Sequence, residues 1–191
     1  MILQTRARNI VIQPAQEWRT IAGEQTDVGT LLREYAAPLS AIPAACHWIG
    51  GSLVGYGHFR TGLVRGLANA IVVWVFGLAG CWLAAIVVER LASSFSSRGS
   101  TAQALKLVVY ASTPVWIAGV LDLVPMLAVL VVVAALYGLY LFYVGLPIVM
   151  HTPADKVIPF MAVSAVVVIV VMVVVASFAS AVTGVGRMAA F

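Results

Sequence analysis

The side chains that could perform acid–base or metal chemistry in this sequence are few and widely separated. Its three histidines, His47, His58 and His151, fall in different segments, so they could share a site only if the fold brings them together. No H-E-x-x-H zinc motif, G-x-S-x-G nucleophile motif or phosphate-binding glycine loop occurs. The two cysteines, Cys46 and Cys81, lie in apolar stretches, where a thiol packs as a small apolar group. The sequence therefore predicts a protein that is not an enzyme, with no catalytic residues, no metal site and no cofactor.

Asp122 is the carboxylate with the strongest claim to a role. A charged group inside a membrane costs at least about 2.5–3.5 kcal/mol, so an acidic residue between two long apolar stretches needs a partner or a function. Pro125 follows three residues later, a spacing typical of a helix start. We expect Asp122 to cap the next helix by accepting backbone N–H bonds. A role in transport is the alternative.

Two prolines lie inside long apolar stretches. Because proline has no N–H, Pro114 cannot donate to the carbonyl of Tyr110, and Pro147 cannot donate to that of Tyr143. In lipid a freed carbonyl needs another donor, so two broken helices could frame a polar cavity; the alternative is that the kinks only help the helices to pack. The tyrosines at 137, 140 and 143 could supply hydroxyls. The candidate residues for this cavity are Tyr110, Pro114, Asp122, Tyr140, Tyr143, Gly145 and Pro147.

The elements that must position these residues are membrane-spanning helices. Of the 191 residues 62% are hydrophobic and only 9% are charged, with a mean hydropathy of +1.04. A soluble domain has about 25% charged residues, so this composition indicates an integral membrane protein. A span needs about 20 apolar residues and must satisfy its own backbone hydrogen bonds, which predicts an all-α, multi-pass bundle of five transmembrane helices. The expected spans are residues 35–56, 67–91, 102–121, 123–150 and 153–182.

Residues 1–34 are expected to form a cytoplasmic leader before a transmembrane domain of residues 35–191. Pro14 begins a short amphipathic helix that could lie in the membrane interface with Trp18 at headgroup depth; the alternative is a helix packed on the domain. Orientation follows from the side on which Lys and Arg gather. A cytoplasmic N-terminus places eight inside and three outside: Arg6, Arg8, Arg19, Arg33, Arg90, Arg98, Lys106 and Lys156 against Arg60, Arg65 and Arg187.

Partners are indicated by small residues and by charge. Gly51 and Gly55 have the G-x-x-x-G spacing that lets two helices approach closely, which predicts helix packing and a homo-oligomer. The net charge of +4 is small and dispersed, so no nucleic acid partner is expected.

Thr152, Pro153 and Asp155 have the pattern of an N-cap, a first helical proline and an acidic first turn, which predicts the start of the last helix.

The stretch around the second proline resembles the signature of the Yip family. It reads Y-L-F-Y-V-G-L-P-I-V-M at residues 140–150 and T-P-A-D-K at residues 152–156. Further matches are Pro14 and Trp18, the Y-A-S-T-P segment at residues 110–114, and Asp122 with Pro125. The resemblance implies a small membrane protein with five spans and a cytosolic N-terminus. Eukaryotic relatives are associated with Rab-type GTPases and carry a longer N-terminal region with a D-L-Y-G-P-type motif. This chain lacks that motif, so a bacterial-type member is expected and a Rab-type GTPase partner is not.

Two functions are therefore carried forward. The first is a non-enzymatic protein of the bacterial cytoplasmic (inner) membrane that acts through contacts with membrane lipids or with a membrane-protein partner, in membrane organisation or a trafficking-like role. The second is a small transporter or channel-like protein whose path runs between the third and fourth spans at their prolines.

Overall fold

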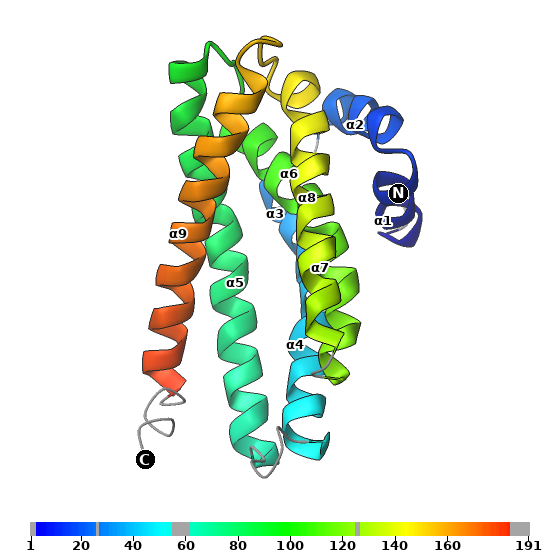
Figure 1. The fold of residues 1–191 in the computed structure, drawn as a ribbon, viewed down its shortest axis with the longest axis vertical. Helices are drawn as coiled ribbons and strands as arrows, with labels where there is room; N and C mark the ends of the chain where they lie inside the picture. Colours follow the sequence, from blue (N-terminus) through cyan, green and yellow to red (C-terminus); the bar gives the residue numbers. More distant parts are fainter. Residues whose placement is uncertain (1–2, 26, 55–61, 125–126, 184–191) are drawn as a thin grey trace.

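The computed structural model describes residues 3–25, 27–54, 62–124 and 127–183, and the regular elements of these residues are helices without any strand (Figure 1). The all-helical class predicted from the sequence is confirmed for this part of the chain. Four of the described helices are long and apolar enough to cross a membrane. They are Leu63–Phe95, Thr101–Leu123, Val129–Val149 and Val157–Phe178.

Helices α5 (Leu63–Ala92) and α9 (Val157–Thr183) lie side by side along most of their length (Figure 1). Helix α9 is rich in valine, which in water favours strands. It is nevertheless helical, as expected for a segment that must satisfy its backbone hydrogen bonds within itself in lipid. Small residues allow the close packing of these helices. A Cβ on Gly80 would lie only 3.2 Å from the sulfur of Met172.

The third predicted span is broken, as expected, next to Pro114. It consists of α6 (Thr101–Ala111), α7 (Thr113–Ala118) and the 3₁₀ turns of η4 (Gly119–Leu123). At the break, the backbone N–H of Ser112 donates to the carbonyl of Val108 at 3.1 Å, and its hydroxyl donates to the same carbonyl at 2.8 Å. Pro114 lies in the first turn of α7, where a backbone N–H would have no partner within the helix. Its missing N–H is therefore tolerated there, and the chain continues as a new helix.

Helix α8 (Ala128–Val149) differs from the sequence expectations at both ends. Pro147 lies in its last turn and does not break it, so only the third span is broken among the described helices. Asp122 does not cap α8, because the helix begins at Ala128 and Leu127 occupies the N-cap position without a side-chain hydrogen bond. Asp122 lies in η4 instead.

The start of α9 was also predicted too early. Thr152 is not its N-cap, since α9 begins at Val157. The Thr152 hydroxyl lies 2.9 Å from the hydroxyl of Ser97 and donates to the carbonyl of Leu146 at 3.2 Å. Thr152 therefore joins the connection before α9 to the connection before α6, and it does not start a helix.

Residues 28–54 form one continuous helical segment. It consists of α3 (Val28–Leu31), the π-helical turn η1 (Leu32–Ala36), α4 (Ala37–Ile49) and a second π-helical turn, η2 (Gly50–Val54). The carboxylate of Asp27 caps its start by accepting from the N–H of Gly29 at 2.9 Å. Pro38 cannot donate a hydrogen bond, and the wider π pattern lies in the turn before it. The segment packs against α5, α7 and η4.

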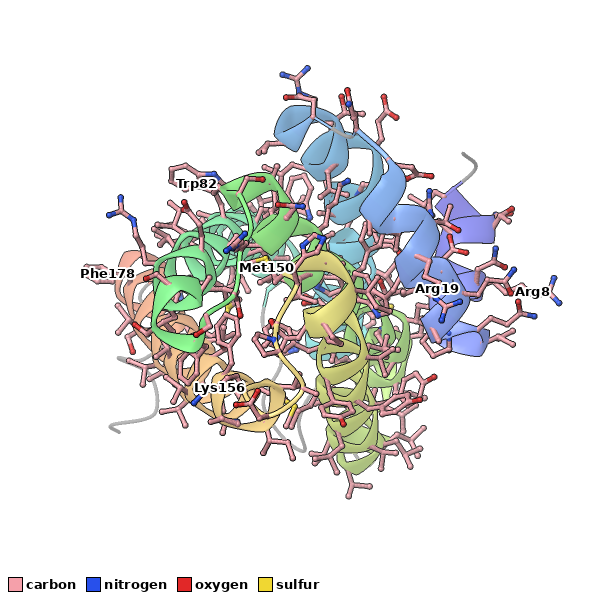
Figure 2. All side chains as sticks on the ribbon, turned by 90° about the horizontal axis from the view of Figure 1, so that it is seen from above. Arg8, Arg19, Trp82, Met150, Lys156 and Phe178 are labelled. Atoms are coloured by element: carbon pink, nitrogen blue, oxygen red, sulfur yellow. The ribbon has the colours of Figure 1, made fainter. Side chains whose placement is uncertain are left out.

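The N-terminal helices α1 (Leu3–Ile12) and α2 (Pro14–Gly23) lie against the side of the bundle, toward the end where residues 93–100 and 150–156 connect the long helices (Figure 1). Helix α9 runs from that end to the opposite one. Figure 2 shows Arg8 and Arg19 pointing away from the bundle. Trp18, in contrast, is fully buried, so it cannot be the interfacial anchor that the sequence suggested.

Candidate functional site

A cavity of about 820 Å³ lies among helices α4 to α9, with η4 at one end. Its walls are mostly apolar, and three long helices each contribute a stripe of residues at helical spacing. The stripe on α5 extends from Asn69 to Cys81, and that on α9 from Ser164 to Met172. Helix α8 contributes Val132, Ala135, Leu136, Leu139 and Phe142.

The cavity opens to the outside of the bundle between α8 and α9. Val132 and Leu136 of α8 and Ile169 of α9 line it, and these side chains are 59%, 64% and 62% exposed. Along α5 the cavity is about 18 Å long from Asn69 to Cys81, at 1.5 Å per residue. One leaflet of a bilayer contributes about half of a hydrocarbon core about 30 Å thick. The length of the cavity along α5 is therefore similar to the thickness of one layer of acyl chains.

Polar side chains gather at one end of the cavity. His47 of α4, Asn69 of α5 and Asp122 of η4 line it there. Two close backbone approaches join these elements. A Cβ on Gly50 would lie 2.8 Å from the carbonyl oxygen of Asp122, and a Cβ on Gly66 would lie 2.9 Å from the Trp48 ring. The close packing at both glycines keeps η4 and the start of α5 against the end of α4.

A buried hydroxyl lies on the cavity wall of α9. Ser164 is 0% exposed, and its Oγ has no hydrogen-bond partner in the described part of the chain. Serine in a membrane helix commonly donates to the carbonyl one turn earlier, as Ser177 does to Val173 at 2.8 Å in the same helix. Ser164 is therefore a buried polar group on an otherwise apolar stretch of wall.

The structure distributes the predicted cavity residues over several places. Asp122 lines the cavity, and Pro114 is buried in α7 between the lining residues Ser112 and Val115. Tyr110 instead lies in an aromatic cluster outside it, described below. Tyr140 and Tyr143 are 48% and 41% exposed, and Pro147 is exposed as well.

Gly145 contacts the N-terminal helices, which sequence reasoning missed. A Cβ at this position would lie 2.6 Å from Cδ1 of Leu107 and 2.7 Å from Cε2 of Trp18. The absence of a side chain on α8 thus makes room for the indole ring of α2. Trp18 also packs edge-on against Tyr110, with ring centroids 6.1 Å apart, and Tyr110 packs on Tyr35 at 4.6 Å.

A buried ionic cluster joins the N-terminal helices to each other and to α6. Arg6 is 4% exposed and pairs with Glu17 at 2.5 Å and with Glu24, while its guanidinium lies 5.8 Å from the centre of the Tyr110 ring. Burial lowers the pKa of Arg6, but the hydrogen bond to Glu24 and the nearby carboxylates raise it, and the net change is upward. Lys106 of α6 donates to the carbonyl of Ile21 at 3.0 Å and to that of Glu24.

These contacts give α1 and α2 a structural role. The hydroxyl of Tyr137 adds a hydrogen bond to the carbonyl of Val11 at 2.6 Å. Because buried charges and backbone carbonyls are costly to leave unpaired, the helix pair is held in one position against α6 and α8. The sequence does contain both residues of this contact, Trp18 in the N-terminal segment and Gly145 inside a predicted helix. They are far apart along the chain, so no local pattern connects them.

Several predicted residues lie outside the described part of the chain. They are Gly55, His58, Arg60, Pro125 and Arg187. Gly51 lies in η2 and is buried within the chain, so pairing of two copies through this glycine spacing stays a prediction. Within the described ranges, no group of three or more His, Cys, Asp or Glu side chains could hold a metal ion.

Comparisons with known proteins identify the family of this chain. A family model described as the Yip1 domain matches residues 8–176. The chain is 26% identical over 156 residues to the "Inner membrane protein YohC" of Escherichia coli strain K12, which covers 77% of this chain and 80% of that protein. The YohC protein of Escherichia coli O6:H1 matches with the same identity and coverage, and no solved structure matches. Since the family model covers most of the chain, this protein belongs to the Yip1 domain family.

Proposed function

We propose that this chain is a non-enzymatic, five-span protein of the bacterial inner membrane that binds membrane lipid in the cavity among α5, α8 and α9. The observation that carries the proposal is the cavity itself. It is large, its walls are mostly apolar, its length is similar to the thickness of one acyl layer and it opens sideways between two helices. An acyl chain is the ligand that such a space fits, because a lipid can enter from the bilayer without crossing water.

The membrane arrangement is part of the proposal. Residues 28–54 are helical over a length sufficient to cross the hydrocarbon core and pack along α5 and α7, which supports a fifth span. Their two prolines, histidine and glycines make them less apolar than the other four. The N-terminal helices, residues 93–100 and residues 150–156 lie toward one end of the bundle and carry most of the described Lys and Arg residues, which supports a cytoplasmic N-terminus. The name of the Escherichia coli relative supports the inner membrane.

Lipid binding accounts for the site better than a transport path does. A path for a polar solute needs polar walls, whereas most of this lining is aliphatic or aromatic. A path between two broken helices also needs both breaks, and α8 continues through Pro147 while Tyr143 is exposed. The break at Pro114 borders the cavity on one side, and there the carbonyl of Val108 accepts hydrogen bonds from both the N–H and the hydroxyl of Ser112.

Retention of lipid by the purified protein tests the proposal. Native mass spectrometry after mild detergent extraction should detect bound phospholipid on the wild-type protein. Ala165→Trp places an indole in the cavity, and it should remove most of that lipid. Val166→Trp is the matched control, because the neighbouring Val166 is 60% exposed and lies off the cavity wall, so this variant should keep the lipid. Ala135→Trp, on the facing wall of α8, should repeat the loss. Equal retention by the Ala165 and Val166 variants would exclude lipid binding in the cavity.

A further inference from the structure

We infer that the polar end of the cavity is a headgroup site for a phospholipid that carries an ammonium group, such as an ethanolamine lipid. The inference rests on the proposed lipid binding and names the class of lipid. Its basis is the type and placement of the polar side chains His47, Asn69 and Asp122, which line one end of a mostly apolar space.

The charge of the lining selects the headgroup. Among the described residues that line the cavity, Asp122 has the only carboxylate, and no lysine or arginine is present. None of the ion pairs between described residues includes Asp122. A carboxylate beside apolar walls is stabilised by a cationic or donor partner, so this end of the cavity favours a positively charged group. An ammonium group supplies that charge and also donates hydrogen bonds, whereas a carboxylate only accepts them.

The neighbouring side chains suit the rest of such a headgroup. The amide of Asn69 can donate to a phosphate or ester oxygen, while His47, which already has an interaction within the chain, lines the same end of the cavity. An anionic lipid without an ammonium group would place its net negative charge against Asp122, where like charges repel. The site thus favours a zwitterionic head over a purely anionic one.

The apolar part of the cavity offers space for the acyl chain of the same lipid. From the level of Asn69 the cavity continues for about 18 Å along α5, between the apolar faces of α8 and α9, as far as Cys81 and Phe142. A lipid with its head at Asp122 therefore belongs to the leaflet at the end of the bundle opposite the loop of residues 93–100. With the proposed orientation this is the outer leaflet of the inner membrane.

A competition between two lipids tests the inference. The purified protein is incubated with equal amounts of dioleoyl-phosphatidylethanolamine and dioleoyl-phosphatidylglycerol, and native mass spectrometry measures the ratio of the two lipids that stay bound. For the wild-type protein we expect enrichment of the ethanolamine lipid by about tenfold, as one charge-assisted hydrogen bond gives. Asp122→Asn should bring the ratio close to one without lowering the total lipid bound. Asp122→Glu should restore much of the enrichment. Asp155→Asn, at a carboxylate that is 74% exposed, should behave as wild type.

The outcomes separate this inference from the proposed function. A wild-type ratio near one, or a ratio that Asp122→Asn leaves unchanged, overturns the headgroup site while lipid binding stands as long as Ala165→Trp still lowers the total. If Ala165→Trp does not lower the total, the cavity does not hold the lipid and both ideas fail. Preference for the glycerol lipid also overturns the headgroup site, since it shows that the cavity end attracts anions.

Discussion

Replacing Gly145 with alanine tests whether a glycine is required at this position for Trp18 to pack against α8. The new Cβ would lie 2.6 Å from Leu107 and 2.7 Å from the Trp18 ring. Leu107 can rotate, but Trp18 is 0% exposed and is packed against Tyr110, so the ring has little room to move. Overpacking of this kind costs about 1–3 kcal/mol. Alanine in a helix is otherwise better than glycine by about 0.5–1 kcal/mol, which offsets part of that cost.

A matched glycine isolates the steric part. Gly77 lies in the middle of α5, and a Cβ there would meet nothing within 4 Å. Gly77→Ala should therefore gain about 0.5–1 kcal/mol from helix propensity alone. The two variants should differ in unfolding free energy by about 1–3 kcal/mol, since only Gly145→Ala adds strain. For a chain of this size each kcal/mol corresponds to about 2–4 °C in Tm. Thermal unfolding in detergent, followed by intrinsic fluorescence, measures the difference.

A second substitution identifies the partner. In a Trp18→Leu background the smaller side chain leaves space, so Gly145→Ala should no longer be destabilising relative to Gly77→Ala. If the two alanine variants unfold at the same temperature in the wild-type background, the glycine is not needed for the docking of α2. If the cost of Gly145→Ala persists without Trp18, the clash lies with Leu107 instead.

Two further substitutions test other buried contacts. Lys106→Met removes the donor to two backbone carbonyls at the end of the N-terminal helix pair. We therefore expect the free energy of unfolding to fall by about 1–3 kcal/mol and residues 1–25 to be proteolysed faster, whereas Lys156→Met, at an exposed position, should change neither. Equal proteolysis of both variants would contradict the structural role of the cluster. Tyr35→Phe removes a 2.8 Å hydrogen bond to the fully buried hydroxyl of Thr113 and should lower the free energy of unfolding by about 1–3 kcal/mol. Adding Thr113→Val should largely recover that loss, because no buried hydroxyl is then left without a partner. The same loss in the single and double variants would show that the hydroxyl pair is not the cause.

Much of the fold follows from local physics that sequence alone contains. The length and hydropathy of the apolar stretches predict the long helices, because lipid leaves the backbone no other way to satisfy its hydrogen bonds. The break beside Pro114 follows from the missing N–H of proline. Helix ends were less accurate. The starts predicted for α8 and α9 were several residues early, since Asp122 and Thr152 hold cap-forming side chains but contact other parts of the chain or the cavity.

The candidate site depends on contacts that no local pattern records. Pro147 was expected to break its helix because it lacks a donor, but α8 includes it and ends at Val149, so the lost hydrogen bond to Tyr143 lies near the end of the helix. Gly145 was expected to belong to that break, whereas in the structure it makes room for the ring of Trp18, which is far away in the sequence. The lateral cavity arises because α8 and α9 both pack on other helices more closely than on each other. Of the predicted residues Asp122 does line the cavity, and the sequence drew attention to it because an acidic side chain between spans is costly in any fold.

The most direct test of lipid binding is a map of where a lipid acyl chain touches the protein in a membrane. The protein is reconstituted with a phosphatidylethanolamine that carries a photoreactive diazirine in its acyl chain, irradiated, and digested for peptide mapping. The account predicts crosslinks on the cavity faces of α8 and α9, at residues such as Leu139, Phe142 and Val168. Crosslinks confined to outward residues such as Val133 and Val173, which are 60% and 59% exposed and lie off the cavity wall, would contradict it.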